Sequence, residues 1–243
     1  MKAPVIAIDG PAGAGKSTVA RAIANIFGLR YVSTGHFYRA VALKALRLGA
    51  DLSSEESLAA LARSTDITMR RDAHGDPRTF VDGEDVTDML ASPEVDGCVS
   101  EVARVPGVRL ALLDRQRSLL LEGGVVMDGR DIGTVVAPDA DLKIFLVASL
   151  EERIGRRLAQ ARELGQEACR GSVADGMAHR DRIDSEREVA PLKPAPDAVV
   201  IDTTGKTPEE TVAQVARLVA RVTGGAAHEP SPPRTEGERA CST

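Results

Sequence analysis

The sequence predicts an α/β protein, a three-layer sandwich in which helices cover both faces of a parallel sheet. Two observations support this prediction. Short apolar runs alternate along the chain with stretches of helical periodicity, as right-handed βαβ units require. In addition, residues 10–17 read GPAGAGKS between an apolar run and a helical pattern, so that a strand, a glycine-rich loop and a helix follow one another.

The predicted strands are short and mostly apolar, as expected for strands that are buried on both faces. They cover residues 5–8, 30–33, 125–127, 143–147 and 198–201. The predicted helices cover residues 16–27, 36–49, 54–63, 93–103, 106–121, 150–164 and 207–222. The last helix has the clearest start, because Thr207 precedes Pro208 and two glutamates in the first turn.

Two segments interrupt the alternation. Residues 65–90 contain two or three β-type runs separated by turn residues, which predicts a small antiparallel insertion. Residues 165–196 are rich in charge and end in a proline-rich stretch, which predicts a mobile flap with a stiff return path. From residue 224 onward the chain lacks periodicity, and we expect a disordered tail.

Composition limits the function classes. A net charge of -5 argues against general nucleic-acid binding, which would bring a clustered basic excess. No apolar run approaches the roughly 20 residues that a membrane span needs, and residues 1–8 do not resemble a signal peptide. We therefore expect a cytoplasmic protein without a membrane partner. Cys98, Cys169 and Cys241 are widely spaced, which favours free thiols over a zinc site or a disulfide framework.

The loop 10–17 has the pattern of a phosphate-binding loop. Its glycines at 10, 13 and 15 allow backbone N–H groups to surround a phosphate at the positive end of the next helix. Lys16 is expected to reach the β and γ phosphates of a nucleotide, and Ser17 to bind Mg²⁺.

Three further clusters carry arginines and acids. Residues 128–134, DGRDIGT, follow a predicted strand and therefore lie at the carboxyl edge of the sheet, where open α/β sheets bind ligands. Residues 180–187, RDRIDSER, are compatible with a helix that is either functional or merely solvated and rich in ion pairs. Residues 33–39, STGHFYR, fit a second phosphate-holding turn. Together the clusters favour phosphoryl transfer, in which a protein mainly positions reactants and stabilises charge.

On these motifs the chain resembles the bacterial cytidylate kinases from Pro4 to about Val222. The resemblance rests on IDGP before the loop, Thr34-Gly35 with Tyr38-Arg39, DGRDIGT, and the segment from Arg180 to Leu192. It implies transfer of a phosphoryl group from ATP to CMP or dCMP, with Mg²⁺. We also expect a monomer. The resemblance also implies a five-stranded core at about 1–35, 105–150 and 197–222, an acceptor region at about 36–104 with the β insertion, a helical lid at about 151–196, and a tail at 223–243.

The resemblance also implies roles for single residues. The ATP site would be Gly10, Pro11, Ala12, Gly13, Ala14, Gly15, Lys16, Ser17 and Thr18. The CMP site would be Thr34, Tyr38, Arg39, Ser100, Arg109, Arg130, Asp131, Asp184 and Arg187. Among these, Arg39, Arg130 and Arg187 would hold the acceptor phosphate, and Ser100, Arg109 and Asp131 would read the cytosine. The catalytic residues would be Lys16, Arg130, Arg180 and Arg187.

One turn departs from the pattern of the family. Ser33-Thr34-Gly35 stands where the family commonly has Asp-Ser-Gly, so the hydroxyl is retained at Thr34 while the acid is absent. Two other functions remain open at this point: a kinase for another nucleoside monophosphate or small metabolite, and a regulatory switch that hydrolyses its nucleotide. The sequence lacks the guanine-reading pattern Asn-Lys-x-Asp that many such switches would need.

Overall fold

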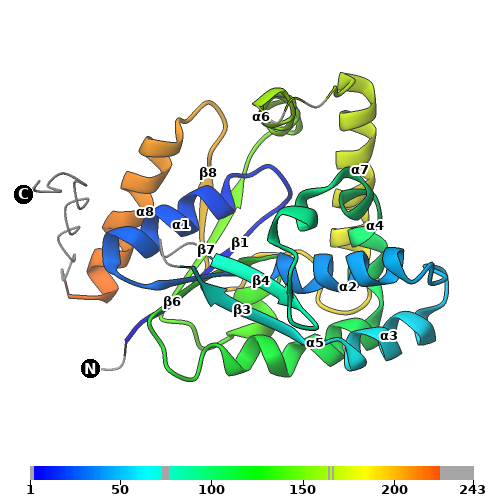
Figure 1. The fold of residues 1–243 in the computed structure, drawn as a ribbon. Helices are drawn as coiled ribbons and strands as arrows, with labels where there is room; N and C mark the ends of the chain where they lie inside the picture. Colours follow the sequence, from blue (N-terminus) through cyan, green and yellow to red (C-terminus); the bar gives the residue numbers. More distant parts are fainter. Residues whose placement is uncertain (1–2, 73–76, 164, 166, 225–243) are drawn as a thin grey trace, which may run out of the picture.

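The computed structural model describes residues 3–72, 77–163, 165 and 167–224. Its centre is a five-stranded parallel sheet in the order β2-β6-β1-β7-β8, which confirms the predicted fold class (Figure 1). The strands are β1 (Val5–Asp9), β2 (Arg30–Ser33), β6 (Val125–Gly129), β7 (Leu142–Val147) and β8 (Val199–Asp202). All five lie within one or two residues of the predicted runs.

Helices cover both faces of this sheet because its inner strands are apolar on both sides. Ile6 and Ile8 of β1 pack on the face covered by α1 (Lys16–Phe27) and α8 (Pro208–Val222). Val5 and Ala7 point to the opposite face, where they pack with Val136. The start of α8 is fixed by a capping box, in which Thr207 and Glu210 exchange side-chain to backbone hydrogen bonds.

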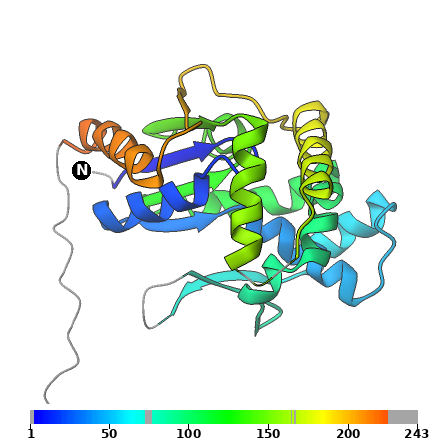
Figure 2. The same cartoon turned by 90° about the horizontal axis from the view of Figure 1, so that it is seen from above.

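A second group of elements has a hydrophobic core of its own. It contains α2 (Gly35–Arg47), α3 (Glu55–Ser64), α4 (Pro93–Arg104) and α5 (Pro106–Ser118), and residues such as Leu58, Val99 and Leu112 lie in its core. The antiparallel sheet of β3 (Ile67–Arg71), β4 (Pro77–Val81) and β5 (Glu84–Asp85) joins this group, which confirms the predicted insertion (Figure 2). Its residues 73–76 lie outside the described part of the chain.

Two helices, α6 (Leu150–Glu163) and α7 (Arg170–Glu186), connect β7 to the last part of the chain. Figure 1 shows them at the carboxyl ends of the strands, beside the second group of elements. The family resemblance implied a helical lid here, but the residue pattern itself favoured helix only at the end of α7 and a flap for the rest. The reason is that only Met177 and Asp184 of α7 are buried, so the helix has no apolar stripe.

Two short elements were not predicted: the 3₁₀ helix η1 (Thr87–Ala91) and the π-helical turn η2 (Ile132–Val136), which follows Asp131. Residues 225–243, most of the predicted tail, lie outside the described part of the chain. The functional division into core, acceptor region and lid stays a prediction. Among the helices of the described residues, none has both the length and the apolar composition to cross a membrane.

Candidate active site

The glycine-rich loop leaves β1 at the carboxyl edge of the sheet and leads into α1, as predicted. Gly10 has a φ of 147°, and a Cβ atom at this position would lie 2.1 Å from the carbonyl oxygen of Leu146. Gly13 and Gly15 have φ angles of 76° and 88°, which side chains rarely adopt. The loop therefore requires glycine at all three positions, because each has a backbone conformation that other residues rarely adopt. At Gly10 there is also no space for a side chain.

Lys16 and Ser17 lie at the start of α1, where bound phosphate would be stabilised by the helix dipole. The Lys16 Nζ atom donates a hydrogen bond of 2.7 Å to the Pro11 carbonyl. Burial, and then the nearby charge of Arg130, lower the pKa of Lys16 well below its usual value. The Ser17 hydroxyl donates to Oδ2 of Asp128 at 2.7 Å.

Asp128 lies one residue before the end of β6 and pairs in register with Ile8 of β1. Its Oδ1 atom accepts a hydrogen bond of 3.1 Å from the Tyr31 hydroxyl on β2, while Oδ2 accepts from Ser17. The carboxylate thus joins the phosphate-binding loop to β2. The sequence placed Asp128 in a motif but assigned it no role, and its position directly after a buried strand was the available signal.

Asp9 ends β1 and shapes the turn that carries Asp131. Its two carboxylate oxygens accept hydrogen bonds of 2.8 Å from the backbone N–H groups of Ile132 and Gly133. Burial raises the pKa of Asp9 to about 6, although both of these hydrogen bonds act in the opposite direction. These bonds hold the beginning of η2 against the end of β1.

Asp131 lies between two arginines that the sequence assigned to the acceptor site. Its Oδ2 atom accepts a hydrogen bond of 2.5 Å from Arg109 Nη2, and its Oδ1 atom lies 3.7 Å from Arg187 Nη2. All three side chains are buried. Arg109 Nε and Arg187 Nη2 have no hydrogen-bond partner among the described residues. Buried N–H groups of this kind are costly unless a ligand or a water accepts from them.

Asp184 of α7 forms the second carboxylate of this cluster. Its Oδ2 atom accepts a hydrogen bond of 2.7 Å from Arg130 Nε, and its Oδ1 atom lies 3.4 Å from Arg187 Nη1. Burial raises the pKa of Asp184, but Arg130 and Arg187 outweigh it and lower the pKa overall. The helix is therefore buried and paired at this end rather than fully solvated, as the functional alternative for residues 180–187 requires. Arg187 itself follows the last residue of α7.

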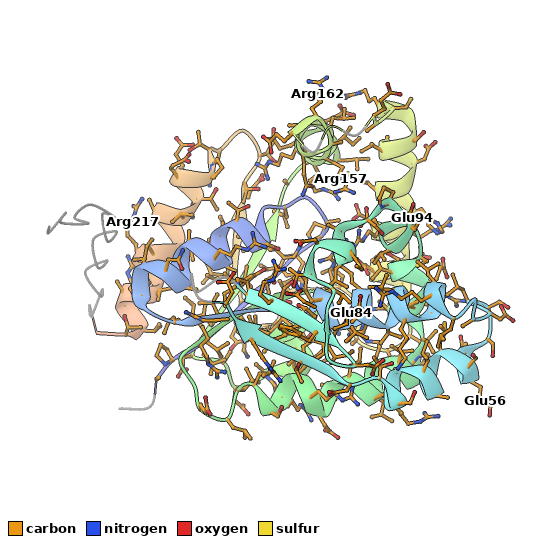
Figure 3. All side chains as sticks on the ribbon, viewed as in Figure 1. Glu56, Glu84, Glu94, Arg157, Arg162 and Arg217 are labelled. Carbon is orange, nitrogen blue, oxygen red and sulfur yellow. The ribbon has the colours of Figure 1, made fainter. Side chains whose placement is uncertain are left out.

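Arg39 and Arg180 meet at a third carboxylate, Asp96 of α4. Arg39 Nη2 lies 2.5 Å from Asp96 Oδ1, and Arg180 Nη1 lies 3.2 Å from the same atom. Arg157 of α6 donates to Oδ2 at 2.7 Å. In Figure 3, Arg157 extends from α6 toward the body of the molecule, whereas Arg162 extends away from it. No motif indicated Asp96 or Arg157, because each lies in an ordinary amphipathic or charged helix.

Among the remaining predicted residues, Thr34 and Tyr38 contact the residues described above. The Thr34 hydroxyl and backbone N–H both donate to the carbonyl of Asp128, at 2.9 and 3.0 Å. The buried Tyr38 ring lies 5.1 Å from the guanidinium carbon of Arg109, in a cation–π contact. Ser100 is half-buried on α4, one helical turn after Asp96.

Two arginines of α6 contact the phosphate-binding loop itself. Arg153 Nη1 donates to the Ala12 carbonyl at 3.3 Å, and both of its terminal nitrogens bind the carboxylate of Asp181 on α7. Arg156 Nη1 donates to the Gly13 carbonyl at 3.3 Å. Neither residue was predicted from the sequence. Their signal was weak, since the first turns of α6 alternate acids and arginines as a solvated helix does.

The site thus combines a phosphate-binding loop with arginine–carboxylate clusters at one edge of a parallel sheet. A family model described as cytidylate kinase matches residues 6–221. The chain belongs to the cytidylate kinase family. It is 50% identical over 222 residues to the cytidylate kinase of Pelotomaculum thermopropionicum, covering 91% of this chain and 97% of that protein.

A second relative agrees with membership of the cytidylate kinase family. The chain is 53% identical over 213 residues to the cytidylate kinase of Desulfitobacterium hafniense, covering 88% of this chain and 91% of the relative. Among solved structures, an uncharacterized protein from Eubacterium ventriosum has a TM-score of 0.50 at 11% identity, covering 91% of this chain and 99% of that one. At this identity the likeness concerns the fold alone. Membership of the family makes the chain a phosphotransferase, as the sequence predicted.

Proposed function

We propose that the protein transfers the γ-phosphoryl group of ATP to CMP or dCMP and releases CDP or dCDP. The family and the phosphate-binding loop support the kinase chemistry. The observation that supports the acceptor site is that two buried N–H groups beside Asp131, Arg109 Nε and Arg187 Nη2, have no hydrogen-bond partner among the described residues. These groups need hydrogen-bond acceptors, and a nucleoside monophosphate supplies them.

Mg²⁺ fits the donor side of the site. The hydroxyl of Ser17 and the carboxylate of Asp128 lie within 2.7 Å of each other, and oxygen donors of these kinds suit Mg²⁺ when phosphate oxygens complete its shell. When bound, the ion neutralises part of the charge on the transferring phosphoryl group. Tyr31 fixes the orientation of Asp128, and Lys16, buried beside Arg130 and Asp128, would bind the β and γ phosphates.

The acceptor phosphate would lie among Arg39, Arg130 and Arg187. A phosphate monoester is an anion near neutral pH and is already nucleophilic, so the reaction does not need a strong base. The arginines hold this anion in line with the γ phosphate and neutralise the charge that would otherwise repel the two nucleotides. Arg130 and Arg187 share Asp184, which keeps both guanidinium groups on one side of the phosphate.

Asp131 and Arg109 give the site its preference for cytosine. A carboxylate accepts a hydrogen bond from the exocyclic amine of cytosine, and a guanidinium donates to the ring nitrogen or O2. Uracil presents an oxygen where cytosine presents the amine, so it would face the carboxylate of Asp131 with a second acceptor. Since unpaired buried polar groups are costly, UMP would be rejected without any steric block.

α6 and α7 would act as the lid that excludes water. They already connect both sides of the site, because Arg153 reaches the loop carbonyl of Ala12 while Asp184 holds Arg130. In addition, the Met177 methyl group of α7 lies 2.9 Å from where a Cβ atom on Gly13 would be. Exclusion of water favours transfer to the acceptor over hydrolysis of ATP.

A panel of acceptors tests the proposed function. Purified protein with ATP and Mg²⁺ is offered CMP, dCMP, UMP, AMP and GMP, and the products are identified by chromatography. We expect rapid formation of CDP and dCDP, loss of at least about 10²-fold in kcat/KM for UMP, and no measurable turnover by Lys16→Ala. Lys44→Ala, which removes a lysine that pairs with Asp82 between β4 and β5, serves as the matched control. Faster phosphorylation of another monophosphate, or ATP hydrolysis that is independent of any acceptor, contradicts the proposal.

A further inference from the structure

We propose that Asp96 is a positioning residue for phosphoryl transfer, whose carboxylate holds the lid arginine Arg180 beside the acceptor arginine Arg39. The inference rests on the proposed function, because the roles of both arginines do. Asp96 would not touch either nucleotide. It would act through the guanidinium groups that do.

The geometry places one carboxylate at the meeting point of four helices. Asp96 Oδ1 is shared by Arg39 of α2, at 2.5 Å, and Arg180 of α7, at 3.2 Å. Oδ2 accepts from Arg157 of α6 at 2.7 Å, which fixes the plane of the carboxylate. Asp96 itself belongs to α4. Oδ1 therefore binds the two predicted site residues, and Oδ2 binds Arg157 of α6.

Arg180 depends on Asp96 more than Arg39 does. Arg39 has a second anchor, since its Nη1 atom donates to the carbonyl of Leu90 at 2.7 Å. For Arg180, Asp96 provides the described hydrogen bond and ion pair. Burial and the nearby charge of Arg130 lower the pKa of Arg180 to about 10, so the guanidinium lies in surroundings that oppose its charge. A neighbouring carboxylate is what holds it there.

The charges around Asp96 also indicate that its carboxylate holds these arginines in place. The guanidinium groups of Arg39, Arg157 and Arg180 all lie within reach of the two carboxylate oxygens of Asp96. Without this anion the three positive charges would repel one another. Burial raises the pKa of Asp96, but Arg180, Arg39 and Arg157 outweigh it and hold the pKa at about 2. Asp96 is therefore ionised at neutral pH. It also lies in the first turns of α4, where the helix dipole favours a negative charge.

The position of Asp96 on α4 links it to the predicted acceptor site. Asp96 precedes Ser100 by one helical turn, so both side chains lie on the same face of the helix. The helix that carries Ser100, a predicted base-reading residue, thus also sets the position of two arginines. Ser100, which is predicted to contact the base, and Asp96, which is proposed to position Arg180, thus lie four residues apart on one helix.

Kinetics of Asp96→Asn test the proposal, because this change retains the shape of the side chain and removes its charge. We expect kcat to fall by at least about tenfold, since misplacing a group by 1 Å can cost about 10²-fold in rate. We expect KM for CMP to change by less than about threefold, since the carbonyl of Leu90 still holds Arg39. Asp96→Glu, which restores the charge, should recover part of kcat.

A double-mutant cycle separates this role from a purely structural one. If Asp96 acts through Arg180, the fall in kcat caused by Asp96→Asn disappears when Arg180→Ala is already present. Glu84→Gln, which breaks the exposed pair with Arg47, is the matched control and should leave kcat unchanged. Circular dichroism and urea unfolding establish that each variant is folded under the assay conditions.

The outcomes distinguish this inference from the proposed function. If the wild-type protein does not phosphorylate CMP, the proposed function has failed. If it does, the inference is overturned by an unchanged kcat in Asp96→Asn, by an effect confined to KM, or by a fall in kcat that persists in full beside Arg180→Ala.

Discussion

Asp96, Asp131 and Asp184 each face at least two guanidinium groups in the described part of the chain. An arginine that is held by a carboxylate on one side keeps other N–H groups available for a phosphate or a base. Pairing of this kind also limits the repulsion among several positive charges at one edge of the sheet. It allows the site to contain many arginines in a protein with a net charge of -5.

At the residue scale, Asp131→Asn should alter the choice of base. The amide retains one acceptor oxygen for Arg109 but can turn its NH₂ group toward O4 of uracil, so UMP is no longer repelled. We expect the ratio of kcat/KM for CMP to that for UMP to fall by about 10- to 100-fold, measured in competition with both acceptors present. Asp197→Asn, which alters an ion pair with Lys143 away from the site, is the control. An unchanged ratio would refute the role given to Asp131.

Asp96 also makes stability depend on pH. Its pKa of about 2 in the folded protein lies below the ordinary value of 3.8, so its ion pairs stabilise the fold above pH 4 and are lost as the pH falls toward 2. The contribution is at most about 2.5 kcal/mol. In urea unfolding, Asp96→Asn should therefore be less stable than the wild type at pH 7, and the difference should shrink between pH 4 and pH 2. A difference that stays constant over this range would argue against the ion pairs as its cause.

At the scale of elements, the sequence predicted most of the strands and helices because each had a local cause. α1 was predicted over its full length from the loop before it and its apolar stripe, and α8 from its capping residues. The residue pattern did not indicate the early part of α7, because few of its residues are buried. The same holds for site residues, which could be predicted only where a local sequence pattern indicated them. Residues inside a motif, such as Arg130, were found, whereas Asp96 and Arg157 meet over a separation of 61 residues that no local pattern encodes.

The phosphate-binding loop gives a prediction at this scale. Gly10→Ala would place a Cβ atom 2.1 Å from a backbone oxygen of β7, which has no freedom to move away inside the sheet. Gly49→Ala is a matched control, because Gly49 also has a positive φ, 61°, but an added Cβ there would meet nothing within 4 Å. We expect Gly49→Ala to cost about 1–2 kcal/mol in urea unfolding.

Gly10→Ala should cost more than this control and should also abolish binding of ATP, measured by calorimetry with a non-hydrolysable analogue. The reason is that relief of the clash requires the loop to move, and the loop positions the N–H groups that bind phosphate. Equal destabilisation by the two substitutions, with ATP binding retained in both, would show that the space around Gly10 does not constrain the loop.

At the scale of the molecule, the sheet and the second group of elements have separate hydrophobic cores. Polar contacts of the site connect the two, and α6 and α7 contribute to both sides of it. Arg153 binds a loop carbonyl, and through Asp181 it is tied to the helix that carries Asp184. A ligand that orders the loop would thereby also order the residues that face the acceptor.

Donor and acceptor should therefore bind cooperatively. A non-hydrolysable ATP analogue with Mg²⁺ is expected to tighten the binding of CMP by about fivefold or more, and CMP should tighten the binding of the analogue by the same factor, as linkage requires. Calorimetric titration of each ligand with and without the other measures both factors. Asp181→Asn, which weakens the link between α6 and α7, should bring both factors toward one, whereas the remote change Glu84→Gln should leave them unaltered. If the two affinities are independent in the wild type, then these helices do not transmit occupancy from the loop to the acceptor arginines, and the contacts of Arg153 serve only the packing of α6 against α7.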